Sequence, residues 1–226
     1  MGTSAEDKQQ YIAAMGERLG LQYEALWQDM AYLHLVWLEF RELFGIKESR
    51  VVLLNEAAGL FFRIVQDQLW EAVILQIAKL TDPPSSNGKS NLSIQSIPKL
   101  VDDPIFKKEI NGLCERALTA SSFARDLRNR HIAHRDLDLL LGDDARPLPE
   151  VSRLQVATAL DALTAVMNAI SRHYMQSDTT FRHVDRFRGA EHLLRVLNDG
   201  LTAEKARQQR FQDGDFSALH NSGDDL

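Results

Sequence analysis

Apolar residues recur at steps of three and four through the first third of the chain, which is the spacing of one face of an α-helix. This pattern predicts a helix over residues 5–44, and Gly45 ends it. A second long helix is predicted over residues 48–80. The predicted buried positions are Leu26, Met30, Leu33, Trp37, Phe40 and Phe44 in the first helix, and Leu54, Ala58, Phe61, Val65, Leu69, Val73, Ile77 and Leu80 in the second.

Polar residues, prolines and glycines mark where the next elements begin and end. Residues 81–88 read TDPPSSNG and predict a loop. A short helix is expected after Asn91, ending near Asp103. Pro104 suits the first turn of a longer helix that reaches about residue 134, with Asp103 as its N-cap.

Two further helices are predicted after a loop over residues 135–149. One spans about 150–175, and the other spans about 188–209 with a break expected at Gly200. Short connections favour antiparallel neighbours, so the predicted fold is all-α, an antiparallel helical bundle. The expected anchors of the first of these helices are Leu154, Leu160, Leu163, Val166 and Ile170.

Composition places the chain among ordinary globular proteins, with 44% hydrophobic and 26% charged residues in 226. We expect one helical domain over residues 1–210, including an N-terminal helical extension, and an acidic, disordered tail over 211–226. Cys114 is the only cysteine, which fits a reducing compartment, and no apolar run is long enough to span a membrane. We therefore expect a cytoplasmic protein that makes no membrane contact.

A basic segment stands out because the net charge of the whole chain is −6. Residues 125–136, RDLRNRHIAHRD, hold four arginines, two aspartates and two histidines. Phe123, Leu127, His131 and His134 lie at steps of four, four and three, so both histidines continue the apolar face of the helix. In one interpretation they are core or interface residues and the arginines solvate the helix end. In the other, an imidazole and a guanidinium face a phosphate at a seam between helices.

Arg128, Asn129 and His134 match the motif R-[polar]-x4-H of HEPN domains. The segment VVLLNEAAGLFFRIVQDQLWE, the LTDP turn and the RNRHIAHRDLD segment also resemble the abortive-infection branch of that superfamily. The resemblance covers about residues 20–200. It implies a HEPN-like four-helix core with additional N- and C-terminal helices.

The resemblance also implies a metal-independent endoribonuclease, in which the RNA 2′-hydroxyl attacks the adjacent phosphorus. The products are a 2′,3′-cyclic phosphate and a 5′-hydroxyl. This chemistry needs a base, an acid and cations near the phosphorane. His134 is the candidate acid or base, Arg128 the candidate for the phosphorane, and Asn129 would orient one of these groups. Asp82 resembles a turn position of the family and is interpreted as a capping or orienting residue.

One chain supplies one Arg–His pair, whereas the reaction needs two proton-transfer groups. A two-fold homodimer through residues 128–134 would bring two pairs into one cleft, and HEPN enzymes are generally dimers of this type. Six helical positions place Arg128 and His134 roughly 120° apart. Either the helix loosens near 131–134, or Arg128 reaches towards the partner chain's His134. His131 and Arg130 therefore remain secondary candidates.

The sequence also supports expectations about metals, cofactors, partners and RNA-binding residues. His131, His134 and Asp138 could hold a metal, but no further ligand cluster is evident, so we expect no metal and no cofactor. The expected partners are the RNA substrate, a second copy, and an antitoxin or other defence-system protein. The alternative function is a noncatalytic HEPN module that binds RNA, a nucleotide or a protein. The candidate RNA-binding residues are Arg125, Arg135, Arg182, Arg186 and Arg188.

Overall fold

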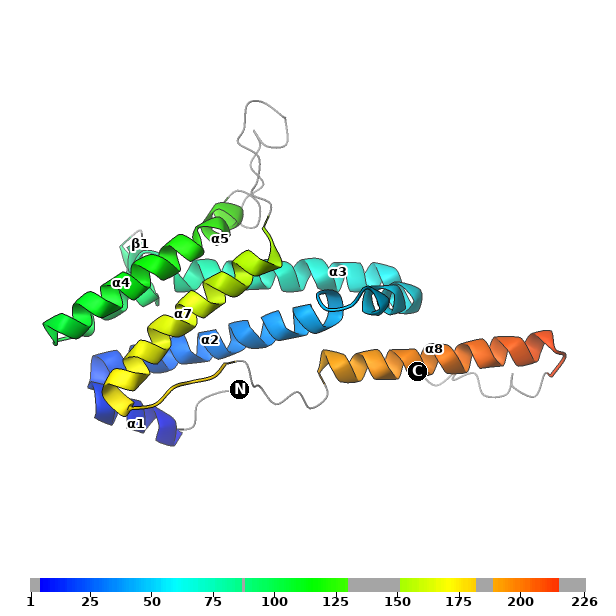
Figure 1. Ribbon diagram of the computed structural model, residues 1–226, viewed down its shortest axis with the longest axis horizontal. Coiled ribbons are helices and arrows are strands. Elements are labelled where there is room, and N and C mark those ends of the chain that lie inside the picture. The colour runs from blue at the N-terminus through cyan, green and yellow to red at the C-terminus, as the bar shows by residue number, and fades with distance from the viewer. Residues whose placement is uncertain (1–4, 87, 130–150, 182–188, 216–226) are drawn as a thin grey trace, which may run out of the picture. The chain divides into compact units, whose positions relative to one another are not determined.

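A computed structural model describes residues 5–86, 88–129, 151–181 and 189–215 (Figure 1). Apart from one small hairpin, the regular structure of these residues is helical, which confirms the predicted all-α class. The elements are α1 (Ala5–Met15), α2 (Glu17–Phe44), α3 (Glu48–Leu80), β1 (Ser85–Ser86), β2 (Lys89–Ser90), the 3₁₀ helix η1 (Ile94–Leu100), α4 (Pro104–Ala120), α5 (Ser122–Leu127), α7 (Arg153–Met175) and α8 (Ala190–Gln212).

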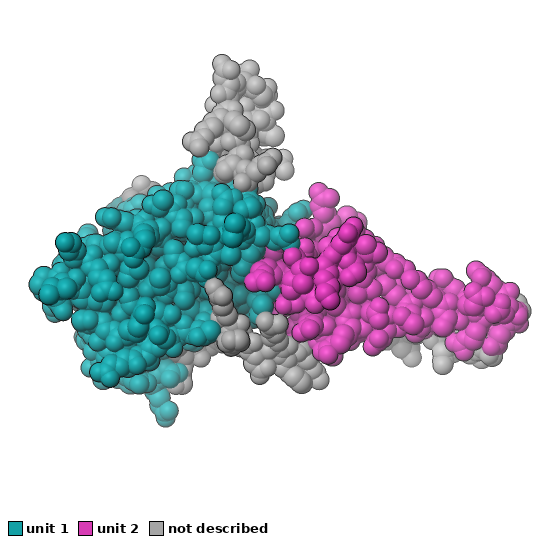
Figure 2. Space-filling model, in the orientation of Figure 1, with its two compact units in different colours: residues 1–38, 67–184 teal, residues 39–66, 185–226 magenta. Residues whose placement is uncertain are grey.

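The chain divides into two compact units, shown in different colours in Figure 2. Unit 1 comprises Met1–Leu38 and Asp67–Val184, and unit 2 comprises Glu39–Gln66 and Asp185–Leu226. The division falls inside α2 and α3. A single domain over residues 1–210 and a disordered tail stay predictions.

Most of the buried apolar residues of unit 1 come from α2, the second half of α3, η1, α4 and α7. Helix α7 packs against α4 and α1, and η1 packs against α4. The predicted anchors of α7 are buried except Leu154, which is 75% exposed because it lies in the first turn of the helix. Among the described helices only α7 is long and apolar enough to cross a membrane, and half of its most apolar 18-residue window is buried inside the protein. A cytoplasmic location stays a prediction.

The predicted helix over residues 5–44 is wrong in one respect, because Gly16 separates α1 from α2. Gly16 has φ of +80°, a left-handed conformation that glycine adopts without a steric penalty. The predicted core positions of α2 from Leu26 to Phe40 are buried, and Phe44 is half-buried.

Helix α3 has the predicted bounds, but its apolar face is interrupted at Ala58. This residue has an extended backbone (φ −165°, ψ 67°), so the residues after it are rotated relative to those before it. As a result Phe62 is buried, whereas Ala58 and Phe61, both predicted core residues, are exposed. In the second half of the helix the predicted positions Val73, Ile77 and Leu80 are buried.

The helix that opens at Pro104 also ends earlier than predicted. Asp103 caps it as expected, since its carboxylate accepts a hydrogen bond of 2.8 Å from the backbone N–H of Ile105. Ser121 then leaves the helical conformation, with φ −101° and ψ 4°, and separates α4 from α5. Helix α8, by contrast, continues through Gly200 without the expected break.

Candidate functional site

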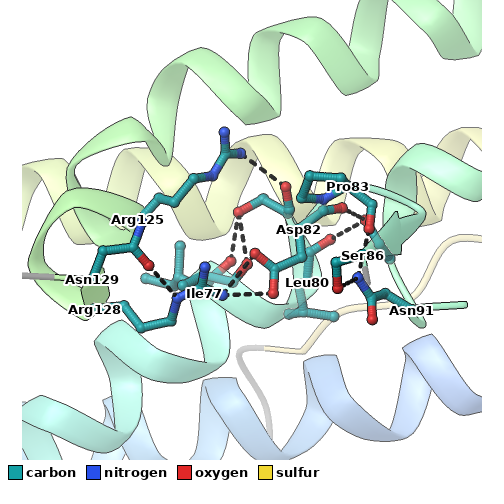
Figure 3. Close-up of polar contacts among 12 residues, drawn as sticks. Ile77, Leu80, Asp82, Pro83, Ser86, Asn91, Arg125, Arg128 and Asn129 are labelled. Carbon is teal, nitrogen blue, oxygen red and sulfur yellow. Dashed lines mark hydrogen bonds and ion pairs between the residues drawn. The ribbon is translucent and has the colours of Figure 1, made fainter. Parts of the chain in front are cut away.

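The turn that follows α3 is held at four consecutive backbone carbonyls. Each carbonyl of residues 80–83 lies within hydrogen-bond distance of a side-chain donor (Figure 3). Thr81 is fully buried, and its hydroxyl donates to the Ile77 carbonyl at 2.8 Å, which extends the end of α3. Loops are usually more mobile than the elements they connect, so this density of contacts makes the turn unusually well fixed. The contacts join Ser93 Oγ to the carbonyl oxygens of Leu80 (3.2 Å) and Asp82 (2.5 Å), Gln95 Nε2 to that of Thr81 (2.8 Å), and Asn91 Nδ2 to that of Pro83 (2.9 Å).

Asp82, at the centre of this turn, forms an ion pair with Arg128. Arg128 Nη1 lies 2.7 Å from Oδ1 and 2.6 Å from Oδ2 of the carboxylate. The side chains are 22% (Arg128) and 19% (Asp82) exposed, so water reaches the pair only in part. Charge-assisted hydrogen bonds of this kind are shorter and more directional than neutral ones. The pair therefore fixes where the Arg128 guanidinium lies.

Asn129 holds a second edge of the same guanidinium. Its Oδ1 accepts a hydrogen bond of 3.0 Å from Arg128 Nε, and its side chain is exposed. Arg128 and Asn129 continue α5 in a π-helical turn, which is wider than an α-helical turn. Single π turns inside helices occur frequently at functional sites. Residues 131–134, where loosening of the helix is expected, lie outside the described residues.

Arg125 lies one turn earlier on α5 and also contacts the turn. Its Nη2 donates to the Thr81 carbonyl at 2.9 Å, and the residue is half-buried. This guanidinium therefore braces the backbone that presents Asp82. Its predicted contact with RNA stays a prediction.

The remaining predicted site residues lie outside the described residues. These are His134, the secondary candidates His131 and Arg130, and the RNA-binding candidates Arg135, Arg182, Arg186 and Arg188. Asp138, considered as a metal ligand, lies outside them too. The structure therefore brings together Arg128, Asn129 and Arg125 from the predicted set.

Cys114 on α4 takes no part in this arrangement. It is buried, and its Sγ donates to the Ile94 carbonyl at 3.5 Å. Burial is the main cause that raises the pKa of this thiol to about 12, with the nearby Glu115 charge as a smaller cause. A neutral buried thiol is a weak nucleophile, so Cys114 belongs to the core.

Residue spacing does not indicate that Arg128 pairs with Asp82, because 46 positions separate the two residues. The local signal is the LTDP turn itself, whose resemblance to a turn of the family indicates a capping or orienting role for Asp82. Ser93 and Gln95, which hold the turn, had no distinguishing pattern at all. Chemically, the assembled group is a fixed guanidinium with one carboxylate and one amide beside it. Such a group can bind an oxyanion such as a phosphate.

A family model described as AbiU2, of the HEPN type, matches residues 16–193. The matched range contains α2, α3, α4, α5, α7 and the whole arrangement around Arg128. No curated protein and no solved structure matches the chain.

Proposed function

Because this chain belongs to the AbiU2 family of HEPN domains, we propose that it is a metal-independent endoribonuclease that acts in phage defence or in a toxin–antitoxin system. The observation that carries the proposal is the fixed guanidinium of Arg128 at the first position of the R-N-x4-H motif. A guanidinium stays charged at every physiological pH and suits the negative charge of a phosphorane.

In the proposed reaction the RNA 2′-oxygen attacks the adjacent phosphorus and the 5′-oxygen leaves. One group removes the 2′-hydroxyl proton, and another gives a proton to the leaving 5′-oxygen. His134 is proposed for one of these transfers, and Arg128 binds a non-bridging oxygen of the phosphorane. Asn129 supports this role by accepting a hydrogen bond from Arg128 Nε at 3.0 Å. The products are a 2′,3′-cyclic phosphate and a 5′-hydroxyl.

The second proton-transfer group is proposed to come from a second copy of the chain. A two-fold homodimer through residues 128–134 would supply a second His134 to the same cleft. An antitoxin or another defence-system protein is the further partner that such a toxic activity requires, because uncontrolled RNA cleavage would harm the cell that makes the enzyme.

A noncatalytic HEPN module that binds RNA, a nucleotide or a protein is the second candidate. Two observations favour it. The net charge of the chain is −6, whereas RNA-binding proteins are commonly basic, and the Asp82 carboxylate already neutralises Arg128.

The test is cleavage of mixed RNA by the purified chain in the presence of EDTA. The wild type is compared with Arg128→Ala and His134→Ala, and with Arg116→Ala on the exposed side of α4 as a charge-matched control. We expect fast cleavage by the wild type and the control, with 2′,3′-cyclic phosphate ends, and residual cleavage at least about a hundredfold slower by Arg128→Ala and His134→Ala. An RNA that carries 2′-deoxyribose at the cleaved position should not be cleaved there. A folded wild type that cleaves no RNA would support the noncatalytic module instead, and cleavage abolished by EDTA would indicate a metal. Light scattering at micromolar concentration tests the dimer, and a monomer would contradict it.

A further inference from the structure

We infer that Asp82 is a positioning residue for Arg128, which it holds so that a single terminal nitrogen, Nη2, is left to bind a non-bridging phosphate oxygen of RNA. The inference rests on the proposed function for its substrate. Asp82 lies outside the R-N-x4-H motif. In this proposal Nη1 of Arg128 binds Asp82, Nε binds Asn129 and Nη2 binds the phosphate.

Two of the three nitrogens of the Arg128 guanidinium, Nη1 and Nε, have hydrogen-bond partners among the described residues. Nη1 lies 2.7 Å and 2.6 Å from the two oxygens of the Asp82 carboxylate, and Nε donates to Asn129 Oδ1 at 3.0 Å. Within the described part of the chain, Nη2 has no hydrogen-bond partner. We assign the phosphate oxygen to the N–H groups of Nη2, because Nη1 and Nε have these partners and the guanidinium cannot turn about Nε–Cζ without breaking the contacts with Asp82.

Asp82 can hold Arg128 because its own backbone is held independently. The Ser93 hydroxyl lies 2.5 Å from the Asp82 carbonyl oxygen, and Gln95 and Arg125 both donate to the preceding carbonyl of Thr81, at 2.8 and 2.9 Å. None of these contacts involves the Asp82 carboxylate. A functional side chain is placed accurately when the residues around it are themselves held by hydrogen bonds, as the backbone of Asp82 is here.

The simpler explanation, that the ion pair only stabilises the fold, accounts for less of this arrangement. The two side chains are only 22% and 19% exposed, so the hydration that they lose offsets much of their attraction, and the pair is weak evidence of a stabilising role. An ion pair kept for stability alone would not need a turn whose carbonyls at four successive positions have side-chain partners. The arrangement instead limits the orientation of one guanidinium at a site that has a chemical role in the proposed reaction.

The kinetic experiment uses Asp82→Asn and Asp82→Ala in the full chain. Asp82→Asn keeps the size of the side chain and one acceptor oxygen, and Asp199→Asn on the exposed part of α8 is the charge-matched control. We expect kcat for RNA cleavage to fall about tenfold in Asp82→Asn and about a hundredfold in Asp82→Ala, because a misplaced donor is lost from the transition state, while KM changes little. In an Arg128→Ala background, Asp82→Ala should reduce kcat no further, since Asp82 acts through Arg128.

The cleavage of phosphorothioate substrates separates a positioning role of Asp82 from a merely structural one, because a structural role would not change the preference between the two diastereomers. Sulfur in place of one non-bridging oxygen weakens the hydrogen bond from Nη2, so the wild type should cleave one of the two diastereomers more slowly than the other. This preference should disappear in Asp82→Ala and persist in Asp199→Asn. Equal preference in Asp82→Ala and the wild type, or an additive loss of kcat in the Arg128→Ala background, overturns the inference while leaving the proposed function in place.

A third measurement decides the positioning role without any cleavage. A guanidinium held at Nη1 rotates slowly about Nε–Cζ, so the Nη signals of Arg128 should be separate in NMR spectra of the wild type and of Asp199→Asn. They should merge in Asp82→Ala. If the wild type cleaves no RNA, the proposed function fails, and these spectra alone then support the positioning role or, if they are the same in all variants, overturn it.

Discussion

The Ser93 hydroxyl lies 2.5 Å from the backbone carbonyl oxygen of Asp82 and joins the first turn of η1 to the turn that presents the Asp82 carboxylate. Ser93 Oγ also caps η1, because it accepts a hydrogen bond of 3.2 Å from the backbone N–H of Gln95. Ser93 is fully buried, so neither contact can be replaced by bulk water.

Ser93→Ala should therefore lower the free energy of unfolding by about 1–2 kcal/mol, from the lost cap and an unsatisfied buried carbonyl. It should also lower the rate of RNA cleavage, since Asp82 loses one of its supports. Denaturant unfolding and cleavage assays measure the two effects, with Ser85→Ala on exposed β1 as the control. An Ser93→Ala variant with wild-type stability would contradict the capping role.

Helix boundaries could be predicted where glycine, proline or a polar cap marks them locally. Helix α3 has the predicted bounds because Gly45 precedes it and the proline-rich turn follows it. The interruption at Ala58 had no such signal, since alanine has the highest helix propensity of all residues. The break at Ser121 had little, because one serine inside a helix is common. The local pattern of apolar residues therefore contains the cause of neither departure.

The candidate site could be located from the sequence but not assembled. The basic segment and the motif indicated Arg128 and Asn129, and the apolar spacing placed Phe123 and Leu127 on the buried face, where both are less than 10% exposed. The pairing of Arg128 with Asp82 depends on how the end of α3 meets α5. Such a contact between distant segments follows from the tertiary fold and not from residue spacing.

Gly20 should not tolerate a side chain, because α1 lies directly against it. A Cβ atom at this position would be 2.7 Å from Ile12 Cα and from the Tyr11 carbonyl oxygen, and backbone atoms cannot move aside as a side chain can. Gly20→Ala should therefore cost about 1–3 kcal/mol of stability. The matched control is Gly112→Ala in the middle of α4, where nothing lies within 4 Å of the added Cβ. Thermal unfolding should show a gain of about 0.5–1 kcal/mol for the control, and a stable Gly20→Ala variant would refute the close packing of α1 on α2.

Glu39 should control the order of the first turn of α8 within unit 2. Its Oε2 accepts a hydrogen bond of 2.6 Å from the backbone N–H of Ala190, and Gly189, the N-cap residue, offers no side chain for this purpose. A carboxylate at a helix N-terminus is favoured by the hydrogen bond and by the helix dipole. Glu39→Ala should speed amide hydrogen exchange at residues 190–194 about fivefold, which corresponds to the loss of a cap worth about 1 kcal/mol. Glu39→Gln, which keeps an acceptor oxygen, should show a smaller effect, and unchanged exchange in Glu39→Ala would exclude the capping role.

Cys114 should make the folded protein sensitive to alkaline pH. Burial raises the pKa of its thiol from the ordinary value of 9.0 to about 12, so the unfolded chain releases this proton at lower pH than the folded protein does. The neutral thiol makes its full contribution to the free energy of unfolding below about pH 9. This contribution is lost as the pH rises towards 12, at no more than about 1.4 kcal/mol per pH unit. Urea unfolding between pH 8 and pH 10.5 should show a shallower decline in Cys114→Ala than in the wild type, whatever stability the lost side chain costs at all pH values. Burial also raises the pKa of Tyr11 to about 12. Tyr11 therefore adds to the decline of the free energy of unfolding with rising pH, and Tyr11→Phe should remove this part of the decline. Identical pH slopes in the wild type and Cys114→Ala would show that the thiol ionises as readily in the folded protein as in the unfolded chain.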